Sequence, residues 1–147
     1  MKNTFTQETL AWLELNSYQI DNPNIGGKYG NSALAKASRE ANISVMRELL
    51  DSKVDLEVRN IDGNSVLWNS CFSGSDEATK MLIEADIELD SINDNGVTAL
   101  MYCASSGKEA MVAMLLEYGA DKEIENLDGF RAIDLAVTPK IYKLLRG

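Results

Sequence analysis

One stretch of the sequence is repeated along most of the chain: Asn93-Asp94-Asn95-Gly96-Val97-Thr98-Ala99-Leu100-Met101-Tyr102-Cys103-Ala104-Ser105-Ser106-Gly107. Its glycine recurs every 33 positions, at Gly30, Gly63, Gly96 and Gly129. The same interval separates Leu34, Leu67, Leu100 and Ile133, and it separates Asn60, Asn93 and Asn126. A fixed period of this length is the signature of a stacked repeat array. The sequence therefore predicts a solenoid built from one supersecondary unit.

The third copy indicates how the repeated residues form one unit. Asn95-Gly96 favours a tight turn, because both residues tolerate a positive φ. Thr98 can cap the helix that follows. A second helix is predicted over about residues 109–118, and Gly119 suits its left-handed end. The predicted unit is turn, helix, turn, helix and loop.

These residues also carry a resemblance to a known family. Thr98-Ala99-Leu100-Met101-Tyr102-Cys103 lies where the ankyrin repeat prefers Thr-Pro-Leu-His-x-Ala, and Leu115-Leu116-Glu117-Tyr118-Gly119-Ala120-Asp121 is an almost unaltered family stretch. The resemblance covers four copies, from about residue 27 to 147. It implies an all-α solenoid of helix-turn-helix units with projecting β-turn or hairpin loops. No copy has the proline or the histidine of the family motif, so hydrogen bonds between repeats through that histidine are not expected.

The repeats predict a single ankyrin-repeat domain over residues 1–147. Its expected parts are an N-terminal capping half-repeat, three repeats and a truncated C-terminal capping repeat, at 1–26, 27–59, 60–92, 93–125 and 126–147. A helix that Thr4, Thr6 or Thr9 could cap is expected in the first part, ending near Leu15. The last copy is four residues short between its helices.

The register also predicts two ladders of equivalent buried positions. The first helices contribute Leu34, Leu67, Leu100 and Ile133, and the second helices contribute Leu49, Leu82 and Leu115. Cys71 and Cys103 lie on small-residue faces, so buried and unreactive thiols are expected rather than a redox or metal pair. Alanine, lysine and aspartate replace glycine at three helix ends, at Ala41, Lys53 and Asp86.

Composition and charge limit the kinds of partner. The 147 residues have 45% hydrophobic content, which fits a soluble domain with a real core. The net charge is −9, and residues 60–130 hold fourteen acids against three bases. An acidic middle argues against nucleic acid as a partner. Two interpretations of the acids stay open: they suit a basic protein surface, or they keep the array soluble.

Targeting signals are not apparent. No secretory signal or membrane-spanning segment is expected, so no membrane partner is expected either. Two free cysteines favour a reducing cytoplasm. Such a domain is expected to be a monomer.

Most catalytic chemistry is excluded, because the chain has no histidine and therefore no Ser–His or Cys–His pair. No cofactor or metal is expected. Ser105-Ser106-Gly107-Lys108 lacks the first glycine of a phosphate loop, and Asp86-x-Glu88-x-Asp90 lacks the glycine and the bidentate glutamate of a calcium loop.

A surface for a partner protein remains. On a helical wheel that starts at Leu67, Trp68, Asn69 and Phe72 turn away from the core. The same geometry turns Ala35, Lys36 and Arg39 outward in the preceding copy. The predicted partner-binding residues of the first helices and turns are Arg59, Ile61, Asp62, Asn64, Trp68, Phe72, Ile92, Asp94, Asn95, Val97, Met101, Tyr102, Ser105, Asp128 and Phe130. For Trp68 and Met101, packing between neighbouring repeats is the alternative.

The expected function follows from the resemblance and from this surface. A non-catalytic protein–protein interaction module is expected, which binds its partner through the turn tips and the concave face of the first helices. One alternative is a small acidic inhibitor of a basic enzyme, of the immunity or antitoxin type. An enzyme is a further, less favoured alternative, because the sequence contains no pattern of a nucleophile with a general base.

Overall fold

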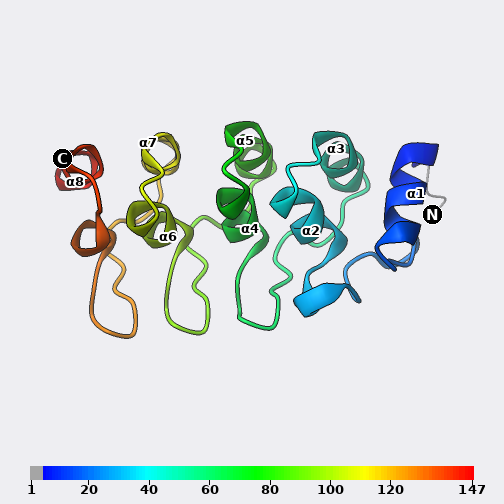
Figure 1. Ribbon diagram of the computed structural model, residues 1–147, viewed down its shortest axis with the longest axis horizontal. Coiled ribbons are helices and arrows are strands. Elements are labelled where there is room, and N and C mark those ends of the chain that lie inside the picture. The colour runs from blue at the N-terminus through cyan, green and yellow to red at the C-terminus, as the bar shows by residue number, and fades with distance from the viewer. Residues whose placement is uncertain (1–4) are drawn as a thin grey trace. The chain divides into compact units, whose positions relative to one another are not determined.

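The computed structural model describes residues 5–147 and contains helices but no β-strand in that range (Figure 1). The predicted all-α fold class is confirmed. The chain forms two compact units, Met1–Ile87 and Glu88–Gly147, which are called unit 1 and unit 2 below.

Unit 1 contains the first helices and second helices of two repeats, preceded by one further helix. Its elements are α1 (Gln7–Leu15), the 3₁₀ turn η1 (Lys28–Gly30), α2 (Ala33–Arg39), α3 (Ile43–Asp51), α4 (Val66–Ser73) and α5 (Asp76–Glu84). The first helices α2 and α4 pack side by side, and each packs against its own second helix, α3 or α5 (Figure 1). The N-terminal α1 packs against α3.

Unit 2 repeats the arrangement in shortened form. Its elements are α6 (Ala99–Ser105), α7 (Glu109–Glu117), the 3₁₀ turn η2 (Ala132–Leu135) and α8 (Pro139–Arg146). The first helix α6 packs against both α7 and η2, and α8 packs against α7 and η2. The fourth copy lacks four residues between its helices, and its first helix is accordingly reduced to a four-residue 3₁₀ turn.

Equivalent hydroxyl groups start the first helices of the three full copies. Ser32, Ser65 and Thr98 each accept a hydrogen bond from the backbone N–H three residues further on, at 3.2, 3.1 and 3.1 Å. Each hydroxyl satisfies one of the N–H groups that a helix start leaves without an intrahelical partner. The predicted cap at Thr98 is confirmed.

The recurrent asparagine closes each projecting turn. The Asn93 Oδ1 accepts hydrogen bonds from the backbone N–H groups of Asn95 and Val97, at 2.9 and 3.0 Å. The Asn60 and Asn126 side chains make the same pair of bonds in their own turns. A side chain that copies a backbone turn in this way explains why asparagine keeps the period of the repeat.

The recurrent glycine allows two turns of unit 2 to approach each other. Gly96 has a φ of 74°, and a Cβ added there would lie 3.0 Å from the backbone nitrogen of Leu127. That nitrogen donates a hydrogen bond to the Asn95 carbonyl oxygen at 3.1 Å. Any other residue would therefore meet both backbone strain and the neighbouring turn.

Within the repeats, three residues other than glycine take the left-handed conformation at helix ends. Ala41, Lys53 and Asp86 have φ values of 54°, 61° and 67°. Gly119, which matches Lys53 and Asp86 at the end of α7, has a φ of 98°. A left-handed residue with a Cβ costs roughly 1–2 kcal/mol. The fold therefore keeps the helix-ending geometry of its repeat even where the residue that favours it is missing.

The two predicted ladders form the core, with one exception. Leu34, Leu67 and Leu100 are at most 1% exposed, and the second-helix positions Leu49, Leu82 and Leu115 are fully buried. The prediction for Ile133 is wrong, because this residue is only half-buried. It lies in the short 3₁₀ turn η2, which offers less surface for packing than a full helix. Both cysteines are buried and free, as predicted.

One carboxylate on α3, that of Glu48, holds the start of the N-terminal helix α1. Thr6 caps α1, so the expected helix and one of its three candidate caps are confirmed, while Thr4 lies outside the described residues. The Glu48 carboxylate on α3 accepts hydrogen bonds from the Thr6 backbone N–H at 2.7 Å, from the Thr6 hydroxyl at 2.8 Å and from the Thr9 hydroxyl. Burial tends to raise the pKa of Glu48, but these hydrogen bonds outweigh it and lower the pKa below its usual value.

The first prediction concerns the core ladder. Leu100→Ala should lower the free energy of unfolding by about 2–5 kcal/mol, because it removes a fully buried side chain and leaves a cavity. Ile133→Ala is the matched control and should cost less, because its side chain is half-buried. Urea unfolding followed by circular dichroism measures both. Equal losses for the two variants would contradict the burial pattern.

The second prediction concerns Glu48 and pH. A carboxyl group whose pKa is lowered by folding contributes stability that is present above its unfolded pKa and lost as the pH falls through its folded pKa. Glu48→Gln should therefore destabilise the protein at about pH 7, and the difference from wild type should shrink at about pH 3. Glu84→Gln, at an exposed position on α5, is the control. Urea midpoints for Glu48→Gln that differ equally from wild type at both pH values would refute this role.

Candidate functional site

An aromatic pair and a guanidinium group lie together at the surface of unit 1. Trp68 and Phe72 are one turn apart on α4, and their rings stack with centroids 5.8 Å apart and an interplanar angle of 18°. Arg39, the last residue of α2, lies over the Phe72 ring with its Cζ 3.8 Å from the centroid. Phe72 is 43% exposed, Arg39 is exposed and Trp68 is half-buried. The predicted outward orientation of Phe72 and Arg39 is confirmed.

A buried amide lies below this surface. Asn69 was predicted to turn outward, and this prediction is wrong, because the residue has no exposed surface. Its Oδ1 accepts a hydrogen bond from Arg39 Nη1 at 3.3 Å, and its Nδ2 donates to the Ser65 carbonyl oxygen at 3.0 Å. These bonds compensate the cost of burying the amide and hold the guanidinium in place. We call Arg39, Trp68, Asn69 and Phe72 the Arg39 cluster.

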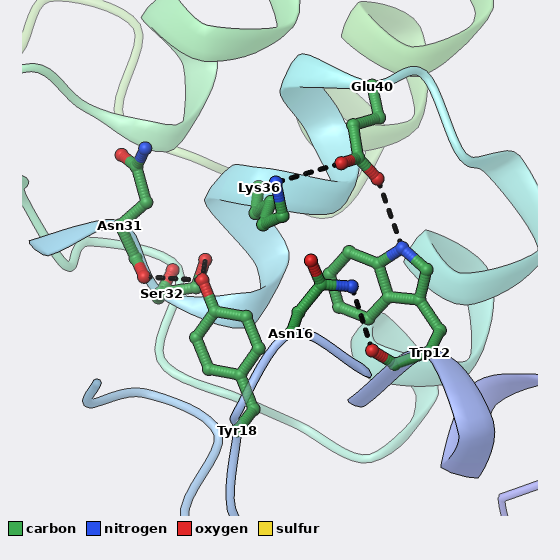
Figure 2. A network of polar contacts seen from close by, with 7 residues as sticks. All are labelled: Trp12, Asn16, Tyr18, Asn31, Ser32, Lys36 and Glu40. Atoms are coloured by element: carbon green, nitrogen blue, oxygen red, sulfur yellow. Dashed lines mark hydrogen bonds and ion pairs between the residues drawn. The ribbon is translucent and has the colours of Figure 1, made fainter. Parts of the chain in front are cut away.

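Glu40, the residue after Arg39, has its carboxylate engaged elsewhere. It forms an ion pair with Lys36 at 2.9 Å and accepts a hydrogen bond from the Trp12 indole N–H at 3.0 Å (Figure 2). The Trp12 ring stacks on Tyr18, with centroids 5.9 Å apart. These contacts join the segment before the first repeat to α2, and they leave Glu40 committed to Lys36 and Trp12.

Tyr18 shares this network. Its hydroxyl donates to the backbone carbonyl oxygen of Asn31 at 2.7 Å, and Figure 2 shows it directed at the Asn31–Ser32 backbone. Burial, assisted by the nearby negative charge of Glu40, raises the pKa of Tyr18 to about 12. The phenol therefore stays protonated at neutral pH and remains a hydrogen-bond donor.

The projecting turns expose apolar side chains beside carboxylates. In unit 1, Ile61 is 67% exposed and precedes the exposed Asp62. In unit 2, Leu127 is 75% exposed and precedes the exposed Asp128, and Phe130 is also exposed. Apolar side chains rimmed by polar groups mark protein interaction sites when they form a contiguous patch, whereas single ones are common on any protein surface.

The other predicted site residues divide by exposure. Those at the surface are Arg59, Ile61, Asp62, Phe72, Ile92, Asp94, Asn95, Ser105, Asp128 and Phe130. Those that are half-buried are Trp68, Val97 and Tyr102. Among them the structure brings Trp68 and Phe72 into contact within unit 1. The predicted residues from Ile92 onward belong to unit 2.

Three further predicted outward positions are wrong, and for Met101 the alternative of packing in the core is the one that the structure shows. Met101 is 1% exposed, because burying a methionine side chain gains about 1.5–3 kcal/mol and favours the core over the surface. Ala35 is buried at the corresponding position of α2. Asn64 is also buried, because its N–H and C=O are both bonded to Asn60, at 3.0 and 3.2 Å, which draws it into the base of the turn.

Sequence reasoning turned Arg39 outward but did not include it in the binding site. The 33-residue spacing of the repeats already indicated that Arg39 belongs to this surface. Arg39 and Phe72 are 33 positions apart and therefore occupy the same place in adjacent repeats. In a stacked array, equivalent positions of neighbouring units lie next to each other. The repeat period thus predicts contacts between side chains as well as the order of helices.

A shallow cavity of ≈ 330 Å³ lies elsewhere in unit 1. It is lined by Leu50, Lys53, Val54, Leu56, Glu84, Ala85 and Asp86. The side chains of Glu84 and Asp86 are both exposed, so they do not form a buried carboxylate pair. Within residues 5–147 no group of three or more His, Cys, Asp or Glu side chains could hold a metal ion.

Comparison with known proteins agrees with this architecture. The family described as "Ankyrin repeats (3 copies)" matches residues 34–126, one copy fewer than the sequence pattern predicted. The chain is also similar to the crystal structure of the ankyrin repeat domain of Bcl-3, described as a unique member of the IkappaB protein family. The TM-score is 0.76 at 22% identity, and the match covers 79% of this chain and 51% of that one. The chain thus spans about half the length of that structure, and the likeness shows the fold.

No curated protein sequence matches the chain. In the described part of the chain, none of the helices has the length and apolar character needed to cross a membrane.

Proposed function

This chain belongs to the ankyrin repeat family, and we propose that it is a non-catalytic module that binds a partner protein through its turn tips and the exposed side of its first helices. The family supports the role of protein interaction. The surface chemistry of the described residues supports the location. The absence of histidine from the sequence removes the commonest general base, which agrees with a non-catalytic role.

The Arg39 cluster is the observation that carries this proposal. Tryptophan and arginine are enriched among the residues that dominate binding energy at protein interfaces. Here the arginine is already held by the Phe72 ring and by Asn69, so less side-chain freedom is lost when a partner docks. An exposed aromatic and cationic group that is preorganised in this way is suited to act as an anchor.

The turn tips of each unit would contribute charge to binding. Asp62, Asp94 and Asp128 are exposed at the tips, and their carboxylates suit basic groups on a partner. Exposed charges mainly guide the encounter of two proteins, whereas apolar anchors slow their separation. The two kinds of residue would therefore act at different steps of binding.

The third prediction tests the anchor with a matched control. The native partner is first isolated by affinity purification from the source cells, and binding kinetics are then measured with purified proteins. Phe72→Ala should speed dissociation about thirtyfold and change association little, because the aromatic side chain acts once the partner has docked. Tyr142→Ala is the control, since Tyr142 on α8 has similar exposure, 48%, and also lies near an arginine, Arg146.

Two outcomes would count against this surface. The first is a dissociation rate that Phe72→Ala leaves unchanged. The second is a loss of affinity with Tyr142→Ala that equals the loss with Phe72→Ala. In either case the partner would bind elsewhere on the chain.

A further inference from the structure

The Arg39 guanidinium has binding capacity that unit 1 does not use. It donates one N–H to Asn69 and packs its face on Phe72. A guanidinium carries five N–H donors, so others remain for an acceptor. Over residues 5–147, no carboxylate forms an ion pair with Arg39. An exposed arginine whose plane is fixed on an aromatic ring is well suited to receive an external anion.

The charges around Arg39 favour an anionic ligand despite the acidity of the whole chain. Glu40 is engaged by Lys36 and Trp12, so it does not neutralise Arg39. The outward positions of α4, Trp68 and Phe72, carry no charge. At physiological ionic strength, charges more than about 8 Å away are largely screened. The Arg39 cluster itself carries one positive charge, on Arg39, and no negative charge.

We propose that the Arg39 cluster binds an acidic peptide segment of the partner, in which an aspartate or glutamate side chain meets the guanidinium and a neighbouring apolar side chain packs against Phe72 and Trp68. This inference rests on the proposed function and specifies the chemistry of the partner. A carboxylate suits the cluster better than a phosphate, because a phosphate dianion calls for more than one cation and Lys36 is already paired. The planar guanidinium matches the two oxygens of a carboxylate.

The Arg39 cluster would be specific for such a segment because it offers two different contacts. The carboxylate would be read by the N–H groups of Arg39, and the apolar side chain by the stacked rings beside them. Both features lie within one cluster on α2 and α4. A segment that carries only one of them would leave either a desolvated charge or an uncovered ring, and would bind more weakly.

A displayed library of random dodecapeptides tests this inference on the full chain. The wild-type protein should enrich peptides with Asp or Glu next to Leu, Ile or Phe. An enriched peptide is then synthesised with its acid and with the matching amide, and its affinity is measured for wild type, Arg39→Gln and Arg47→Gln. Arg47 is an exposed arginine on α3 and serves as the matched control.

Arg39→Gln and the change from acid to amide in the peptide should each lower the affinity about tenfold to a hundredfold, the range of a hydrogen bond to a charged group. The two changes together should lower it little further, because they remove the same contact. Arg47→Gln should have no effect. Circular dichroism confirms that both variants fold.

The inference is overturned if the wild-type chain enriches no acidic peptides, if phosphoserine peptides bind more tightly than their Asp or Glu counterparts, or if Arg39→Gln binds the acidic peptide as wild type does. Peptides that lack an acid but lose affinity with Phe72→Ala would overturn it and leave the proposed function intact. Enriched peptides that Phe72→Ala does not weaken would instead count against the proposed function.

Discussion

A repeat of two short helices has apolar side chains on more sides than its own helices can cover, and this constraint governs the structure. The apolar face of one repeat is buried when a neighbouring repeat stacks on it. In unit 1, α2 packs against α4 as well as against its own second helix, and Leu34 and Leu67 are buried. The positions that remain outside are not needed for the core, so they are available for binding.

Stacking at a fixed period also explains how the candidate site arises. Equivalent positions of adjacent repeats lie beside each other, and Arg39 and Phe72 are such a pair. An exposed cation–π contact contributes only about 0.5–1 kcal/mol, which is small beside the core. Its value lies in orientation, because it presents a charged plane and an aromatic surface together. The buried Asn69 adds a second restraint on the same guanidinium.

Much of this fold could be predicted from the sequence because each repeat supplies the same signals. The 33-residue register located the helices, the Thr98 cap and the leucine ladders. A helical wheel was less successful for surfaces, since it treats each helix in isolation. Met101 and Asn69 lie on short helices packed against several neighbours, and both are buried. The 33-residue register predicts these surface contacts better than the helical wheel. It places Arg39 and Phe72 at equivalent positions, and it places asparagine at each position where its side chain closes a turn.

The central claim is that the exposed side of the first helices, and not that of the second helices, binds the partner. An NMR titration of the isotope-labelled chain with its purified partner tests this claim most directly. The largest shifts are expected in the amides of α2, α4 and the turn tips, with the Arg39 guanidinium and the Trp68 indole signals among them. Shifts concentrated in α3, α5 and α7, with α2 and α4 unchanged, would contradict it.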